Sequence, residues 1–322
     1  MQKRILSGIQ PSGKLHIGNY FGAIKQHIAL QDQGEGFYFI ANYHALTTVQ
    51  DAELLRNLTL DVAIDYLALG LSPEKATLFR QSDVPEVTEL AWLLATVTGM
   101  GLLERAHSYK DKIAKGIAAK VGLFTYPVLM AADILIYQSD LIPVGADQVQ
   151  HIEMTQDMAG YFNTTFGKEV FKRPEAKLNS TAKVPGLDGQ KMSKSYNNTI
   201  EIFAEGNALK KVIMGIVTDS TPVEAPKDPD NSIIFQLYTL FADEKEKEEM
   251  REKFLAGGYG YGEAKKTLLK QIDDYFAPAR SKRKELAKDR AYVEEILQKG
   301  AIKAREEASK TLKAARKACG ID

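Results

Sequence analysis

Short apolar runs alternate with amphipathic stretches along the first half of the chain, and this alternation limits the folds that are open to it. Four runs have the length and residue types of buried strands, and stretches with helical spacing separate them. The four runs are residues 4–7, 36–41, 76–80 and 141–145. Parallel strands need helical crossovers, so the pattern predicts an α/β fold with a doubly wound, Rossmann-like parallel sheet.

The length of 322 residues favours two domains, because one hydrophobic core seldom grows far beyond about 250 residues. We expect a catalytic domain over residues 1–183, with a helical insertion at about 87–122. Residues 199–322 show helical spacing without a strand pattern, so we expect a helical domain there. Its last helix can pack back on the catalytic domain. The helical candidates in it are residues 235–241, 244–254, 263–275 and 278–318.

Charge and cysteine content narrow the classes of partner. The chain has 42 Lys+Arg and 42 Asp+Glu, so its net charge neither indicates nor excludes RNA. A single cysteine, Cys319, allows no internal disulfide and no cysteine-based metal site, and we predict no metal ligands. The N-terminus lacks the pattern of a signal peptide, and residues 127–137 fall short of the roughly 20 apolar residues that span a bilayer. We therefore expect a soluble, cytoplasmic protein that binds neither membrane nor DNA.

The segment after the first strand has the features of a phosphate-binding turn. Gln10-Pro11-Ser12-Gly13 predicts a turn, and His16-Ile17-Gly18 opens the next helix, where backbone N–H groups and the helix dipole favour an anion. Gly18 permits close approach of a nucleotide, and His16 offers a donor for an α-phosphate. Alone, such a turn is more often structural, so the prediction depends on a partner loop.

Residues 184–198 contain that partner loop. They hold Pro185, Gly186 and Gly189 without periodicity, which predicts a mobile loop, and they include Lys191-Met192-Ser193-Lys194-Ser195. A chance match to this pentapeptide is on the order of one in ten thousand. Neither GxGxxG nor a Walker P-loop occurs, which argues against a dinucleotide dehydrogenase or a P-loop kinase. Two ammonium groups on a loop that can close over a phosphate-binding turn point to ATP chemistry.

Together the two signatures resemble the HIGH-type turn and the KMSKS loop of class I aminoacyl-tRNA synthetases. One departure is Asn19, which replaces the second histidine and can hydrogen-bond but not carry positive charge. The resemblance implies His16, Lys191 and Lys194 as catalytic residues. It implies ATP contacts from Gln10, Ser12, Gly18, Asn19, Gly145, Asp147, Lys191, Met192, Ser193, Lys194 and Ser195.

A second set of residues predicts an amino-acid pocket. Tyr126, Met130 and Asp133 share one face of a predicted helix, and a carboxylate in the apolar run 129–136 is costly unless a donor reaches it. A hydrogen-bond donor from the protein itself is about as expected for the Asp133 carboxylate as a donor from a ligand. Asp147 and Gln148 follow the strand at 141–145, at the edge of the sheet where open α/β proteins bind ligands.

These segments are similar to those of bacterial tryptophanyl-tRNA synthetases, as are residues 7–13, 16–20 and 217–220. The similarity implies that Asp133 accepts the indole N–H and that Tyr126 and Gln148 hold the ammonium group. The implied pocket residues are Leu6, His44, Tyr126, Met130, Asp133, Val144 and Gln148. It further implies ATP with Mg²⁺, L-tryptophan, tRNA(Trp), an anticodon-binding helical domain and a homodimer. We expect residues 101–120 to form part of the dimer interface and part of the contact with the acceptor stem.

Three alternatives remain at this point. A tyrosyl enzyme is disfavoured because the Asp133 and Gln148 segments resemble the tryptophanyl branch. A paralogue that only binds RNA would not need both signatures. An adenylyltransferase that acts without tRNA would not need the long helical domain.

Overall fold

The computed structural model describes residues 2–106, 109–110, 116, 118, 120–178 and 183–322. It divides into two compact units. The first comprises Met1–Gly13, Gln26–Asn179 and Leu286–Asp322, and the second comprises Lys14–Lys25 and Ser180–Glu285. Residues 14–25 thus group with the largely helical unit, and residues 286–322 with the sheet.

The first unit is built on a five-stranded parallel sheet. Its strands are β1 (Arg4–Ile9), β2 (Glu35–Ile40), β3 (Ala76–Arg80), β4 (Leu141–Val144) and β5 (Glu175–Leu178). The order is β3-β2-β1-β4-β5, and every pair is parallel, which confirms the predicted fold class. The chain winds in opposite directions on either side of β1 and β4, so the topological switch point lies between these two strands.

Four of the five strands coincide with the predicted apolar runs, but β5 was not predicted. Its sequence Glu175-Ala176-Lys177-Leu178 lies at the edge of the sheet, and both of its end residues are exposed. An edge strand with exposed side chains has no apolar run to reveal it.

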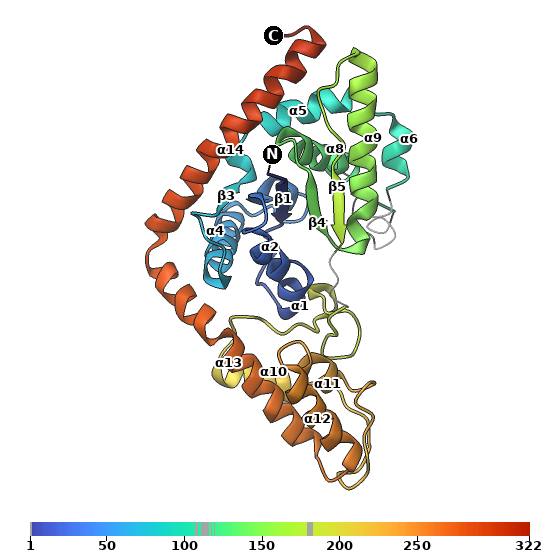
Figure 1. Ribbon diagram of the computed structural model, residues 1–322, viewed down its shortest axis with the longest axis vertical. Helices are drawn as coiled ribbons and strands as arrows, with labels where there is room; N and C mark the ends of the chain where they lie inside the picture. The colour runs from blue at the N-terminus through green and yellow to red at the C-terminus, as the bar shows by residue number, and fades with distance from the viewer. Residues whose placement is uncertain (1, 107–108, 111–115, 117, 119, 179–182) are drawn as a thin grey trace. The chain divides into compact units, whose positions relative to one another are not determined.

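Helices cover the sheet of the first unit (Figure 1). They are α2 (Lys25–Leu30), α3 (Asn42–Ala45), α4 (Ala52–Leu69), α5 (Glu86–Ala95), α6 (Met100–Glu104), α8 (Val121–Ile136), α9 (Val149–Phe166) and α14 (Arg290–Cys319), with 3₁₀ turns η2 (Gln81–Asp83) and η3 (Ala146–Gln148). The predicted helical insertion corresponds in part to α5 and α6. Its residues 107–108, 111–115, 117 and 119 lie outside the described residues.

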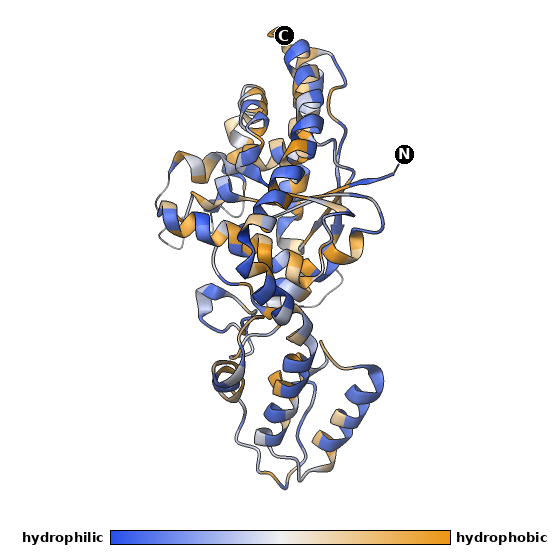
Figure 2. Cartoon of the chain, turned by 90° about the vertical axis from the view of Figure 1, so that its left-hand side faces the viewer, coloured by the Kyte–Doolittle hydropathy of each residue, from blue (hydrophilic) through white to orange (hydrophobic). Residues whose placement is uncertain are grey.

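Helix α14 packs closely against the edge strand β3 (Figure 1). A Cβ atom at Gly300 would lie 1.9 Å from the Leu78 carbonyl oxygen, so only glycine allows this approach. Buried Ala304 and Ala308 extend the small-residue face at helical spacing. Figure 2 shows hydrophilic and hydrophobic residues side by side along this helix, as an amphipathic helix with one buried face requires.

The second unit is largely helical. It contains α1 (Ile17–Asn19), a π-helical turn η1 (Tyr20–Ile24), a 3₁₀ turn η4 (Lys194–Tyr196), α10 (Gly206–Met214), α11 (Ile233–Tyr238), α12 (Glu244–Ala256) and most of α13 (Tyr261–Lys288). Pro278 lies inside α13, although its residue type led us to expect a helix start there, and the break comes at Asp289 instead. Buried Phe276 and Arg280 flank Pro278, so tertiary packing offsets the backbone hydrogen bond that proline lacks.

An aromatic cluster explains why residues 14–25 belong to the second unit. The Tyr20 ring lies 5.1 Å from that of Phe276, and the Phe21 ring lies 5.2 Å from that of Phe241, measured between centroids. The Tyr20 hydroxyl also hydrogen-bonds with the Tyr275 hydroxyl at 3.0 Å. These edge-to-face contacts attach the start of the first crossover, the segment that connects β1 to β2, to α13.

A buried histidine in the first unit should make the stability of the protein depend on pH. His27 Nε2 hydrogen-bonds with Ser7 Oγ at 2.9 Å, and its Nδ1 with the Tyr66 hydroxyl at 3.0 Å. Burial lowers the pKa of His27 from 6.5 to about 4. The unfolded chain therefore binds more protons between these values, and stability present above about pH 6.5 is lost as the pH falls towards 4.

We expect the free energy of unfolding, measured by urea denaturation, to fall over this pH range, and to fall less steeply in a His27→Gln variant. Burial also lowers the pKa of His16 to about 4, but His16 is present in both proteins. The difference between the two slopes therefore isolates the contribution of His27. Parallel slopes would contradict the assignment.

Candidate active site

The segments that follow β1 and β4 lie at the carboxyl edge of the sheet. The turn after β1 is closed by a hydrogen bond from Ser12 N to Gln10 O at 2.9 Å, and Gly13 takes a φ of 113°. Gln10 Nε2 donates to the backbone oxygen of His44 at 3.2 Å. After β4, Gly145 is the N-cap of η3, a turn that contains Asp147 and Gln148. Both segments occupy the positions where doubly wound folds bind ligands.

In the second unit, His16 caps the helix that opens the first crossover. Its Nδ1 accepts a hydrogen bond from Asn19 N at 3.2 Å, and Asn19 Oδ1 accepts one from His16 N at 3.1 Å. This reciprocal pair is a capping box, in which the asparagine side chain serves the backbone of the histidine. The structure therefore gives Asn19 a capping contact that the sequence did not predict.

Burial keeps His16 neutral, and the cap determines which ring nitrogen carries the proton. Burial, followed by the nearby Lys194 ammonium group, lowers the pKa of His16 to about 4, so the ring is neutral at pH 7. Since Nδ1 accepts a hydrogen bond, the ring proton sits on Nε2. His16 can thus donate a hydrogen bond through Nε2 without being charged.

The loop that contains Lys191 and Lys194 lies directly against this helix start. Gly18 N donates to Met192 Sδ at 3.3 Å, and a Cβ atom on Gly18 would lie 2.9 Å from His16 Nδ1. Both lysines are exposed, whereas Met192 is buried. The structure therefore brings the two sequence signatures together, with Met192 as the contact between them.

Hydrogen bonds centred on Asn198 hold the shape of the loop. Ser193 N donates to Asn198 Oδ1 at 2.8 Å, and Asn198 Nδ2 donates to Asp188 Oδ1 at 2.7 Å. Met192 N donates to the Val184 carbonyl oxygen at 2.9 Å. Residues 184–198 are irregular apart from the short turn η4, as their lack of periodicity predicted.

In the first unit, Asp133 is buried on α8 and accepts three hydrogen bonds from two side chains. Gln81 Nε2 lies 2.9 Å from each carboxylate oxygen, and His44 Nε2 lies 2.8 Å from Oδ2. Burial raises the pKa of Asp133, and the hydrogen bonds from His44 and Gln81 oppose that rise. The protein itself thus supplies part of the hydrogen bonding that the sequence assigned to a ligand. Gln81 was not among the predicted residues.

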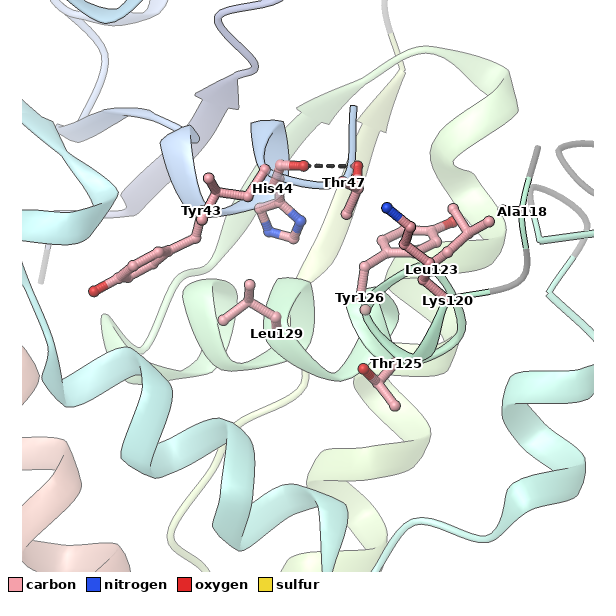
Figure 3. Close-up of a pocket in the computed structure, with 11 residues that line it drawn as sticks. Tyr43, His44, Thr47, Ala118, Lys120, Leu123, Thr125, Tyr126 and Leu129 are labelled. Carbon is pink, nitrogen blue, oxygen red and sulfur yellow. Dashed lines mark hydrogen bonds between the residues drawn. The ribbon is translucent and has the colours of Figure 1, made fainter. Parts of the chain in front are cut away.

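A cavity of about 360 Å³ lies beside this network, and Figure 3 shows the side chains that line it. The His44 ring extends from α3 towards α8, and its centroid lies 6.4 Å from that of Tyr126. The Tyr126 hydroxyl hydrogen-bonds with His151 Nε2 at 2.6 Å. The lining residues are Tyr43, His44, Leu46, Thr47, Ala118, Lys120, Gly122, Leu123, Thr125, Tyr126 and Leu129.

The other predicted pocket residues do not line this cavity. Leu6 is buried in β1, Met130 is half-buried on α8, and Val144 ends β4 half-buried. Asp133 hydrogen-bonds with His44, which lines the cavity, but is not itself a lining residue. His44 and Tyr126 are thus the predicted residues that line the cavity.

Neither a metal site nor a membrane span is found in the part of the chain that the structure describes. Its His, Cys, Asp and Glu side chains form no group of three or more that could hold a metal ion. None of its helices combines the length and the apolar character needed to cross a bilayer.

Comparison with known proteins gives one consistent family. Residues 2–277 match the family model described as tRNA synthetases class I (W and Y). The chain is 60% identical to the tryptophan–tRNA ligase of Rhodopirellula baltica over 99% of both chains, and 58% identical to that of Fusobacterium nucleatum over 99% of this chain and 98% of the relative. The crystal structure of Campylobacter jejuni tryptophanyl-tRNA synthetase complexed with ADP and tryptophan is 51% identical. It superposes with a TM-score of 0.94 and covers 98% of this chain and 99% of its own.

Proposed function

The chain belongs to the class I tRNA synthetases for tryptophan and tyrosine, and from this membership we infer which of its residues carry out each step of the reaction. It is an enzyme that uses ATP to activate L-tryptophan as tryptophanyl-adenylate. It then transfers the tryptophanyl group to the 3′-terminal adenosine of tRNA(Trp).

We propose that His16, Lys191 and Lys194 carry the chemistry at the phosphates. The neutral His16 ring would donate through Nε2 to the α-phosphate as charge grows there, and the two ammonium groups would stabilise the departing pyrophosphate. The single observation that supports this assignment best is the contact of Gly18 with Met192, which brings the histidine and the lysine loop together.

The remaining ATP contacts are also part of the proposal. Gly18, Asn19, Met192, Ser193 and Ser195 would bind near the phosphates. Other parts of ATP would be bound by Gln10 and Ser12. Gly145 and Asp147 would bind either ATP or the amino acid. We propose that Mg²⁺ enters with the ATP phosphates, because the described residues offer no carboxylate cluster for it and Mg²⁺ needs few protein ligands. No step of the reaction is assigned to the ion.

For the amino acid, we propose the cavity at His44 and Tyr126 together with the surrounding residues. Asp133 would accept the indole N–H, while Met130, Val144 and Leu6 would form the apolar walls. Tyr126 and Gln148 would hold the ammonium group. An apolar slot with one acceptor suits indole, which has one donor and no acceptor.

We propose a homodimer that works in the cytoplasm, with the helices of residues 199–285 near the anticodon. Large apolar side chains on α5, α6 and α8 support the dimer, because Trp92 is 69% exposed, Met100 62% and Val121 78%. Exposed apolar residues on neighbouring helices are typical of protein interfaces.

The test of this function compares tryptophan with tyrosine in ATP–pyrophosphate exchange, followed by charging of unfractionated tRNA. We expect exchange with tryptophan to exceed that with tyrosine by about a hundred-fold or more, and tryptophan to become attached to tRNA. Exchange without charging would indicate an adenylyltransferase. Absence of both activities would indicate a paralogue that has lost catalysis.

A further inference from the structure

Gln81 connects the buried carboxylate of Asp133 to the backbone of α3. The residue is 1% exposed and begins the turn η2, directly after β3. Its Nε2 donates to both oxygens of Asp133, and its Oε1 accepts from Tyr43 N at 3.0 Å and from His44 N at 3.4 Å. One side chain thus joins three elements of the first unit.

The partners of Gln81 fix the orientation of its amide group. A flipped amide would place Oε1 against the Asp133 carboxylate and the NH₂ group against two backbone N–H donors. Every one of these contacts would be repulsive in a site with little water to screen it. The donor end must therefore face Asp133.

This arrangement controls which hydrogen bonds Asp133 can still accept. A carboxylate offers about four lone-pair positions. Gln81 shares one donor group between the two oxygens and His44 occupies Oδ2, so Oδ1 keeps an acceptor position for one further donor. Indole supplies one such donor, its ring N–H.

Electrostatics point in the same direction. A carboxylate this deeply buried resists ionisation, and the donors of Gln81 and His44 offset part of that cost. A protonated Asp133 would itself be a donor and would lose its preference for an N–H group.

We propose that Gln81 is a positioning residue for amino-acid selection: it orients the Asp133 carboxylate as the acceptor for the indole N–H. The inference rests on the proposed role of Asp133, and it adds a residue that touches no substrate.

The experiment measures discrimination between tryptophan and 3-(benzothiophen-3-yl)alanine, in which sulfur replaces the ring N–H at similar volume. The readout is the ratio of kcat/KM values for the two substrates in ATP–pyrophosphate exchange. In Gln81→Met, a side chain of similar length without the donor, we expect this ratio to fall by about ten- to a hundred-fold. Both rates come from one protein, so a reduced folded fraction cancels from the ratio.

Two further variants keep the result interpretable. Ser82→Ala is the matched control, because Ser82 and Asn42 form a second link between η2 and α3 that does not touch Asp133. Its ratio should stay at the wild-type value. Gln81→Asn keeps an amide that is too short to span both partners, and we expect its ratio to fall as well.

The outcomes separate this inference from the proposed function. An unchanged ratio in Gln81→Met and Gln81→Asn, with both rates lowered together, would mean that Gln81 is only structural and would overturn the inference alone. An unchanged ratio in Asp133→Ala, which removes both acceptor oxygens, would overturn the proposed indole acceptor and this inference with it.

Discussion

Replacing Lys194 with alanine should lower tryptophan-dependent ATP–pyrophosphate exchange by about a hundred-fold or more, the effect expected when a donor matched to transition-state charge is lost. Lys194 begins the turn η4 on the loop that contacts the His16 helix start through Met192. The ammonium group gains most when charge develops on the leaving pyrophosphate, so the loss should appear mainly in kcat.

Lys245→Ala provides the control for Lys194→Ala. Lys245 lies in the same unit, its side chain is 85% exposed, and its pairing with Glu249 spans 3.8 Å on the surface of α12. The variant makes the same change in net charge and should exchange at the wild-type rate. Near-normal exchange in Lys194→Ala would refute the catalytic assignment.

Replacing Asp133 with alanine should abolish most of the discrimination between tryptophan and phenylalanine. A site built around a substrate hydrogen bond can reject an analogue without it by about ten-thousand-fold, since the buried acceptor would be left unpaired. Without Asp133 that penalty disappears. The measurement is kcat/KM for both amino acids in ATP–pyrophosphate exchange, and unchanged selectivity would count against Asp133 as the acceptor.

Asp133→Ala should also cost stability, which calls for a second variant. It leaves the Gln81 and His44 donors without their acceptor, and each unpaired buried group costs about 1–3 kcal/mol. Asp133→Asn retains the shape and one acceptor oxygen. Thermal unfolding of the two variants then distinguishes lost selectivity from a lost fold.

Much of the fold could be predicted because its signals are local in the sequence. Apolar runs gave β1 to β4 their places, and helical spacing gave α12 and α13, although Pro278 suggested a false boundary. Strand β5 carries no such run. The grouping of residues 14–25 with the helical unit depends on ring contacts such as that of Phe21 with Phe241, which no local pattern contains.

The site was predictable where a motif identified it and not where a distant partner decides it. The family resemblance, drawn from the two signatures and the Asp133 and Gln148 segments, is confirmed. The roles given to single residues remain predictions. Gln81 and Asp133 lie 52 positions apart, and neither sequence neighbourhood indicates the other. The capping contact of Asn19 was not predicted, because Asn19 was compared only with the second histidine of the family signature.

The close packing of α14 on β3 at Gly300 has a consequence for folding during synthesis. Arg80 at the end of β3 and Glu294 on α14 pair across 214 positions, so the strand leaves the ribosome long before its cover exists. During that interval β3 is an uncovered edge strand of the nascent sheet, and it can pair with strands of other chains. Nascent chains stalled before α14 should therefore depend on chaperones, and release of the final helix should end that dependence.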